Sequence, residues 1–192
     1  PKDGFGYRGV RLKPTPGGET TVKVERESIA RRIGRLTGSG LFAESKKCGL
    51  MPDWKDSGVI GCDSVQTAIY GGRVFWAWGD TSLPGYPLGI FHTSAATTAL
   101  SPKFPAEPPL QVVFDLFREE GGRPRGVAKL PGEGPTWISG TLTLKDKNGQ
   151  ERLCTVYNKI KPPLDAYERG LSVWNDEKKE FEPQITLIDA DK

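Results

Sequence analysis

The chain has 192 residues, of which 36% are hydrophobic, and its formal net charge is +3. The 24 glycines and 16 prolines predict many turns between short elements, which favours an all-β architecture. Basic and acidic residues are interspersed, which argues against nucleic-acid binding, and no apolar run approaches the roughly 20 residues of a membrane-spanning helix.

Residues 1–50 are expected to form an N-terminal arm with one strand and a short helix. Val22 and Val24 alternate with polar residues, as in a strand. Beyond them, Ile29 and Ile33 are spaced for one face of a helix. An irregular extended segment is the alternative for the helical stretch, because a glycine within it weakens a helix.

Residues 63–81 predict a β-hairpin. The Gly-Gly pair at its centre suits a two-residue turn, because such turns need positive φ at their central positions. In an antiparallel hairpin the start of one strand and the end of the next lie at the same edge. Asp63 and Asp80 are therefore expected to lie together, beside Trp78.

The alternation of apolar and polar residues and the turn signals predict two successive units of four antiparallel strands, at about residues 63–120 and 133–190. Both units belong to one incomplete domain, residues 51–192. The later strands are expected at residues 88–98, 110–117, 135–145, 152–160, 170–174 and 181–188. Such units are typical of β-propeller blades, whose repeats run about 40 to 50 residues. A closed propeller needs at least four blades, so remaining blades of a parent chain or another copy would be required. A β-sandwich is the alternative, because eight short strands also form one.

Carboxylates at strand ends are the candidates for chemistry. Glycoside hydrolysis uses two carboxyl groups about 5 to 9.5 Å apart, and strand ends around a propeller channel supply that geometry. We expect Asp63 and Asp80 to be the nearest such pair, as general acid and as base or nucleophile. The alternative role for each is to accept hydrogen bonds in a turn.

The candidate substrate-binding residues are Glu133, Trp78, Trp137, Lys159, Glu168 and Arg169. Trp78 could stack on a sugar, although an aromatic residue on a strand more often belongs to the core. Lys159 and Arg169 could bind an acidic or hydroxyl-rich ligand, or hold Glu168 in an ion pair, which is the favoured role of Arg169.

The cysteines and the single histidine predict no metal site. Cys48, Cys62 and Cys154 lack metal-ligand spacing, and His92 is expected to be a packed or hydrogen-bonded side chain. One disulfide with a buried thiol and three buried thiols both remain open. Because the chain starts at Pro1 rather than at a methionine, we expect a processed or excised piece.

A family resemblance rests on two stretches. The run GCDSVQTAIYGGRVFWAWGDT, followed by LGIFHTSAATT, resembles the opening blade of five-bladed β-propeller proteins related to glycoside hydrolases, in a bacterial family of long-unknown function related to endo-D-arabinanases. GEGPTW (132–137) and YERGL (167–171) are similar to the following blade, so the resemblance covers about residues 60–190.

This resemblance implies a funnel-shaped site at the mouth of the propeller channel. Asp63 and Asp80 would be the catalytic pair and Glu133 an auxiliary carboxylate, acting on a polysaccharide such as an arabinan. Some members of the superfamily hold a structural cation such as calcium in the channel, but no residue here identifies one, and no cofactor is expected. An extracellular or periplasmic location is implied. The alternative is a non-catalytic carbohydrate-binding or scaffolding propeller.

Overall fold

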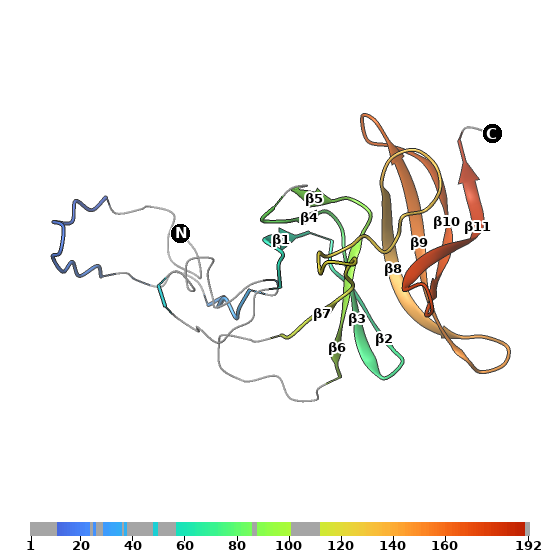
Figure 1. Ribbon diagram of the computed structural model, residues 1–192, viewed down its shortest axis with the longest axis horizontal. Coiled ribbons are helices and arrows are strands. Elements are labelled where there is room, and N and C mark those ends of the chain that lie inside the picture. The colour runs from blue at the N-terminus through green and yellow to red at the C-terminus, as the bar shows by residue number, and fades with distance from the viewer. Residues whose placement is uncertain are drawn as a thin grey trace.

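The computed structural model describes residues 11–23, 25, 29–35, 37, 48–49, 57–85, 88–100 and 112–190. This part of the chain contains β-strands and no helix, which confirms the all-β class. The strands form three antiparallel sheets, two of four strands and one of three (Figure 1).

The first four-stranded sheet has the order β2-β3-β6-β7. Its strands are β2 (Gln66–Tyr70), β3 (Arg73–Trp78), β6 (Ser94–Ala99) and β7 (Asp115–Leu116). Gly71 and Gly72 have φ values of 55° and 70°, so both central positions of the hairpin turn are left-handed, as the Gly-Gly pair predicts. The hairpin of residues 63–81 is therefore confirmed.

A small sheet extends the edge of this hairpin. It has the order β1-β4-β5 and consists of β1 (Gly61–Cys62), β4 (Thr81–Ser82) and β5 (Gly89–Ile90). The single strand predicted at residues 88–98 is thus two strands, β5 and β6. Thr93 between them has a φ of 55°, and a left-handed residue interrupts extended backbone. The strand predicted at residues 110–117 begins outside the described residues, and within 112–117 only β7 is assigned as a strand.

The second four-stranded sheet has the order β11-β10-β9-β8. Its strands are β8 (Thr136–Lys145), β9 (Glu151–Lys161), β10 (Asp165–Asn175) and β11 (Glu180–Asp189). All four predicted strands are present, but β10 is longer than the predicted residues 170–174. A strand usually weakens at a glycine, yet Gly170 lies within β10 opposite Tyr157. The Tyr157 ring covers it, and a Cβ on Gly170 would lie 2.6 Å from that ring.

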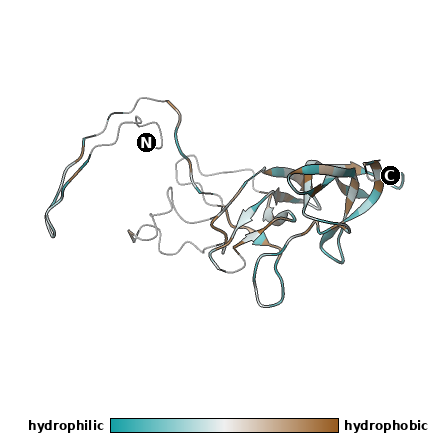
Figure 2. Cartoon of the chain, turned by 90° about the horizontal axis from the view of Figure 1, so that it is seen from above, coloured by the Kyte–Doolittle hydropathy of each residue, from teal (hydrophilic) through white to brown (hydrophobic). Residues whose placement is uncertain are grey.

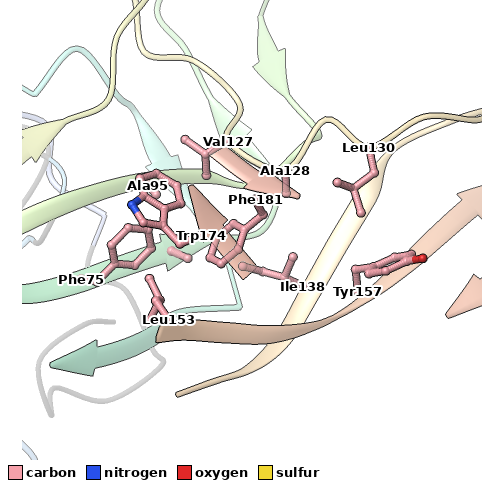
Figure 3. Close-up of a cluster of buried hydrophobic side chains, with 11 residues drawn as sticks. Phe75, Ala95, Val127, Ala128, Leu130, Ile138, Leu153, Tyr157, Trp174 and Phe181 are labelled. Carbon is pink, nitrogen blue, oxygen red and sulfur yellow. The ribbon is translucent and has the colours of Figure 1, made fainter. Parts of the chain in front are cut away.

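The main core lies between the two four-stranded sheets (Figure 3). Phe75 of β3 meets Trp174 of β10 edge to face, with ring centroids 4.9 Å apart. The buried residues come from both sheets and from the segment that connects them: Phe75, Ala77, Ala95, Val127, Ala128, Leu130, Ile138, Leu153, Tyr157, Trp174 and Phe181. Each large side chain buried here contributes about 1.5 to 3 kcal/mol.

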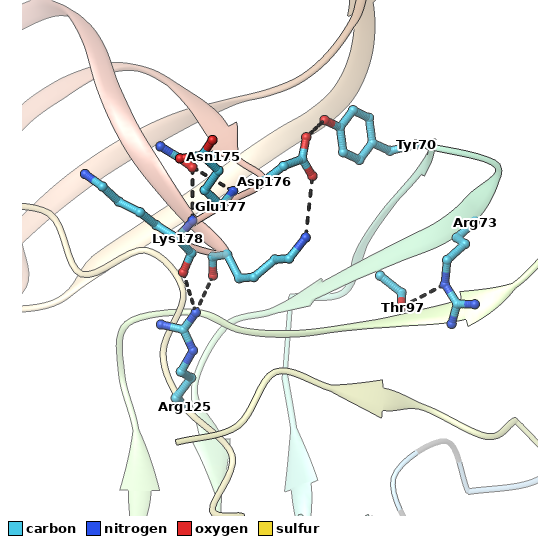
Figure 4. A network of polar contacts seen from close by, with 9 residues as sticks. Tyr70, Arg73, Thr97, Arg125, Asn175, Asp176, Glu177 and Lys178 are labelled. Atoms are coloured by element: carbon cyan, nitrogen blue, oxygen red, sulfur yellow. Dashed lines mark hydrogen bonds and ion pairs between the residues drawn. The ribbon is translucent and has the colours of Figure 1, made fainter. Parts of the chain in front are cut away.

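Polar contacts join the sheets at the turn between β10 and β11 (Figure 4). The hydroxyl of Tyr70 donates to Asp176, and Arg125 donates to the carbonyls of Lys178 and Lys179 at 2.9 and 2.7 Å. Asn175 accepts hydrogen bonds from two amides of the same turn. The turn is therefore held against the first sheet.

The first strands of the two large sheets lie side by side and run in the same direction. The amide of Gly140 on β8 donates to the side chain of Gln66 on β2 at 3.1 Å, and the hydroxyl of Thr143 donates to the carbonyl of Ile69 at 2.6 Å. In each sheet the strands lie side by side in the order in which they occur along the chain. Two such sheets packed face to face fit a pair of blades and a sandwich alike, and no sheet closes on itself in the described part of the chain.

The outer face of the β8–β11 sheet carries a row of apolar side chains. Cross-strand register links Leu142 to Cys154, Leu171 to Val156 and Leu171 to Ile185, so these side chains share the face turned away from the core. Brown hydrophobic segments alternate with teal hydrophilic ones along the strands near the C-terminus in Figure 2. Leu142, Leu171 and Ile185 are 45%, 37% and 54% exposed among the described residues.

The described residues of the N-terminal arm contain neither the predicted strand nor the predicted helix. Ile29 is 100% exposed and Ile33 is 56% exposed, so no surface covers the apolar face that a helix would present. Short helices are not stable in water without such packing. The extended alternative therefore describes residues 29–35, whereas Val24 lies outside the described residues.

Candidate functional site

One pocket lies between the two large sheets, where their first strands, β2 and β8, begin. It measures about 330 Å³, and we call it the aspartate pocket. Its lining residues come from both sheets: Asp63, Ser64, Gln66, Gly79, Asp80, Trp137, Ile138, Ser139 and Asn158. A site of this size is at the lower end of the range for small-ligand pockets.

The backbone places Asp63 and Asp80 side by side. The amide of Asp63 donates to the carbonyl of Asp80 at 3.0 Å, and the amide of Gly79 donates to the carbonyl of Asp63 at 3.1 Å. These bonds lie between the β2–β3 hairpin and the β1–β4 pair, in which Cys62 is opposite Thr81. The juxtaposition expected from the hairpin is therefore present.

Glycine at position 79 is required by the position of the Asp63 carboxylate. A Cβ on Gly79 would overlap Oδ1 of Asp63, so a larger residue would push this carboxylate away. The same Oδ1 accepts a hydrogen bond of 3.1 Å from the amide of Ser64, which has a φ of 42°. The Ser64 amide thus holds the Asp63 carboxylate beside Gly79, the residue that follows β3.

The two carboxylates have unlike surroundings. Asp63 is exposed, whereas Asp80 is half-buried. Burial raises the pKa of Asp80 above its ordinary value, and the negative charge of Asp63 raises it further, while the indole N–H of Trp137 opposes both effects. Asp80 therefore holds a proton to higher pH than an ordinary aspartate.

Trp137 and Asn158 form the opposite wall of the aspartate pocket. They are cross-strand neighbours on β8 and β9, so their side chains share one face of the sheet. Asn158 and Gln66 did not stand out in the sequence. The only signal for Asn158 is its position on a strand between Tyr157 and Lys159, both of which are buried.

Trp78 does not line the aspartate pocket. It is only 2% exposed, and its ring packs on Trp76 and Phe114, with centroids 6.4 and 5.1 Å away. Stacking on a sugar requires an open ring face, which Trp78 lacks. Trp78 is therefore a core residue, which is the alternative considered for an aromatic side chain on a strand.

Lys159 is completely buried and faces no ligand site. Its ammonium donates to the carbonyls of Leu130, Gly132 and Gly134 at 3.1, 3.3 and 3.0 Å. Burial lowers the pKa of this lysine, and the charge of Glu168 partly offsets the effect. All three N–H donors are used within the chain, so the predicted ligand-binding role is replaced by a structural one.

Glu133, Glu168 and Arg169 also lie away from the aspartate pocket. Glu133 is exposed in the turn before β8, and its carbonyl accepts from the Tyr167 hydroxyl at 2.9 Å. Glu168 accepts from the Tyr157 hydroxyl at 2.6 Å. Among the ion pairs of the described residues there is none between Glu168 and Arg169, because neighbours on a strand point to opposite faces.

All three cysteines are free, so the disulfide alternative is wrong. Cys48 is exposed, and Cys62 and Cys154 are half-buried. The second alternative, in which all three thiols are buried, is therefore wrong as well. Burial, followed by the charge of Asp63, raises the pKa of Cys62 to about 12, which keeps this thiol protonated and unreactive. Burial has the opposite effect on His92: it lowers the pKa of the imidazole, whose Nδ1 is buried without a hydrogen-bond partner.

Within the described residues, no three side chains of the His, Cys, Asp and Glu types gather as ligands for a metal ion. The same residues contain no helix long and apolar enough to cross a membrane. Comparisons with protein-family models, curated proteins and solved structures give no match for this chain. Its function must therefore be inferred from the aspartate pocket itself.

Proposed function

We propose that this chain is part of a β-propeller that binds a carbohydrate in the aspartate pocket and hydrolyses a glycosidic bond there. The supporting observation is the unequal pair of carboxylates in one pocket. Asp80 is half-buried with a raised pKa, and Asp63 beside it is exposed. Glycosidases separate acid and base roles in this way, by placing two carboxyl groups in unlike environments.

The assignment of roles follows from these environments. A general acid must carry a proton at the working pH, and the raised pKa of Asp80 favours that role. Asp63, more open to water, is the base or nucleophile. The neighbouring charge of Asp63 itself helps Asp80 to retain its proton.

The other lining groups favour a hydroxyl-rich ligand. Gln66, Ser139 and Asn158 offer both donors and acceptors, and the ring of Trp137 supplies an apolar wall. This combination of a few polar groups with an aromatic surface suits a sugar. The resemblance of residues 61–81 to arabinanase-related propellers favours a furanoside polysaccharide and an extracellular or periplasmic location.

Three features support the propeller architecture. Each large sheet is a four-stranded meander, the first strands β2 and β8 run parallel side by side, and the aspartate pocket lies where these two strands begin. First strands line the channel of a propeller. The apolar outer face of the β8–β11 sheet would then pack against a further blade, from a longer parent chain or from another copy.

The test is hydrolysis of arabinan and of other plant and bacterial polysaccharides by the full-length protein. Asp63→Asn and Asp80→Asn should each lower the rate by about 10²-fold or more, because each removes an acid or base from the reaction. Asp176→Asn, far from the pocket in the β10–β11 turn, is the matched control and should retain activity. Equal rates for the wild type and the Asp63→Asn, Asp80→Asn double variant would refute the catalytic proposal.

A non-catalytic carbohydrate-binding propeller is the second candidate, because the same polar groups and the Trp137 ring also suit sugar binding alone. Titration calorimetry with the same polysaccharides distinguishes the two. Measurable affinity without release of product over a long incubation would favour the binding protein.

A further inference from the structure

We propose that Trp137 is a positioning residue for Asp80, whose carboxylate it orients by donating a hydrogen bond from its indole N–H. This inference rests on the proposed function only in giving Asp80 a chemical role. The two side chains come from different sheets and line the same pocket, because Trp137 lies on β8 and Asp80 lies between β3 and β4.

Two complementary polar atoms meet at this junction. Nε1 of Trp137 and Oδ1 of Asp80 are both buried, and neither has a hydrogen-bond partner among the described residues. An indole N–H can only donate and a carboxylate oxygen can only accept, so each is the partner that the other lacks. Buried polar atoms in native proteins are nearly always paired.

The indole N–H lies near enough to the carboxylate to affect the pKa of Asp80. It opposes the rise in the Asp80 pKa that burial and Asp63 cause, as expected of a donor that favours the anion. Hydrogen bonds at catalytic groups are often long or poorly aligned before substrate binds and tighten afterwards. The unpaired state of both atoms in the free protein agrees with that behaviour.

The surroundings of Trp137 restrict its movement. Thr136 and Ile138 on either side are buried toward the core, and the carbonyl of Thr136 accepts from the hydroxyl of Thr93 at 3.3 Å. The backbone of β8 is thereby fixed, and Trp137 projects to the pocket side. The protonation of Asp80 then depends on both sheets, since Asp63 comes from the first and Trp137 from the second.

The test is the pKa of Asp80 in the free full-length protein, followed through the ¹³C shift of its carboxyl carbon. Trp137→Phe keeps an aromatic ring but removes the N–H, and the pKa of Asp80 should rise by about 0.5 to 1. Trp76→Phe is the matched control. It removes an indole N–H that donates to Thr98 on the other face of β3, and the pKa of Asp80 should not change.

An unchanged or lower pKa of Asp80 in Trp137→Phe would overturn the proposal. Should that variant fail to fold, the wild type still gives an answer. The indole ¹H and ¹⁵N shifts of Trp137 should titrate with the pKa of Asp80, and this titration should vanish in Asp80→Asn. A Trp137 indole signal that ignores pH over the same range contradicts the contact.

No sugar is needed for these measurements, so the two proposals can fail separately. A raised Asp80 pKa in Trp137→Phe without hydrolysis by the wild type supports the positioning role and refutes the enzyme. Hydrolysis together with an unchanged pKa supports the enzyme and refutes the role of Trp137.

Discussion

The main-chain amide of Asp63 donates a hydrogen bond of 3.0 Å to the carbonyl of Asp80. This bond joins the start of one strand segment to the end of another, and both residues line the aspartate pocket. Their side chains are thus brought together by backbone pairing rather than by a flexible loop. Sites built on paired strands are held more rigidly than sites on loops.

We expect Gly79→Ala to disrupt this arrangement. The new Cβ would overlap Oδ1 of Asp63, so the carboxylate must move and the free energy of unfolding should fall by about 1 to 3 kcal/mol. Urea unfolding measures the loss. Gly61→Ala on β1 is the control, because no atom lies within 4 Å of the position that its new Cβ would occupy, and its change should stay within about 0.5 kcal/mol. Equal effects of the two substitutions would contradict the steric argument.

The raised pKa of Asp80 predicts a pH dependence of stability. Its pKa in the folded state lies above the ordinary value of 3.8, so the folded state binds more protons than the unfolded state between those two pKa values. Stability then falls as pH rises through that window and stays lower above it. Asp80→Asn should remove this decline and be the more stable protein at neutral pH.

Urea unfolding of the wild type and of Asp80→Asn from pH 3 to 8 shows whether the free energy of unfolding falls as pH rises. Asp63→Asn offers a second check, because loss of the neighbouring charge should lower the pKa of Asp80 and reduce the decline. A difference between wild type and Asp80→Asn that is flat across this range, or that favours the wild type at neutral pH, would exclude the effect.

The sequence predicted the position of the aspartates because that position depends on local chemistry. A Gly-Gly turn and strand pairing determine where Asp63 and Asp80 meet, and both signals lie within one hairpin. The surroundings of Trp78 and Lys159 depend instead on distant parts of the chain. Phe114 covers Trp78, and carbonyls of residues 130–134 enclose the ammonium of Lys159.

The contact between Trp137 and Asp80 could not be predicted for the same reason. It exists only because the second sheet packs with β8 beside β2, and no periodicity in the sequence specifies that packing. The sequence made Trp137 a candidate substrate-binding residue but assigned no contact to its indole N–H. Docking of two sheets is the step that converts such candidates into a site.

Lys159→Met should destabilise the protein strongly. It removes the only donor that the structure gives to the carbonyl of Leu130 and the ammonium bonds to Gly132 and Gly134, while leaving a side chain of similar length, so we expect a loss of about 3 kcal/mol. Lys145→Met at the exposed end of β8 is the matched control and should change stability little. Thermal or urea unfolding compares the two variants. Similar midpoints for both would show that the carbonyl contacts contribute nothing.

The apolar outer face of the β8–β11 sheet predicts self-association of this chain when it is studied alone. Leu142, Leu171 and Ile185 are partly open to solvent, and contiguous exposed apolar side chains favour contact with a second surface. Sedimentation should show an average mass that rises with concentration. Replacing the three by asparagine should shift it to the monomer without loss of stability, because these side chains contribute little to the core.

Leu164→Asn is the control for this experiment. Leu164 is 74% exposed, but it lies in the turn between β9 and β10 rather than on the outer face, so its replacement should leave the association unchanged. A monomer at every concentration would argue against a docking face and so against the proposed further blade. Association that persists in the triple variant would show that the chain does associate, but through a surface other than the outer face.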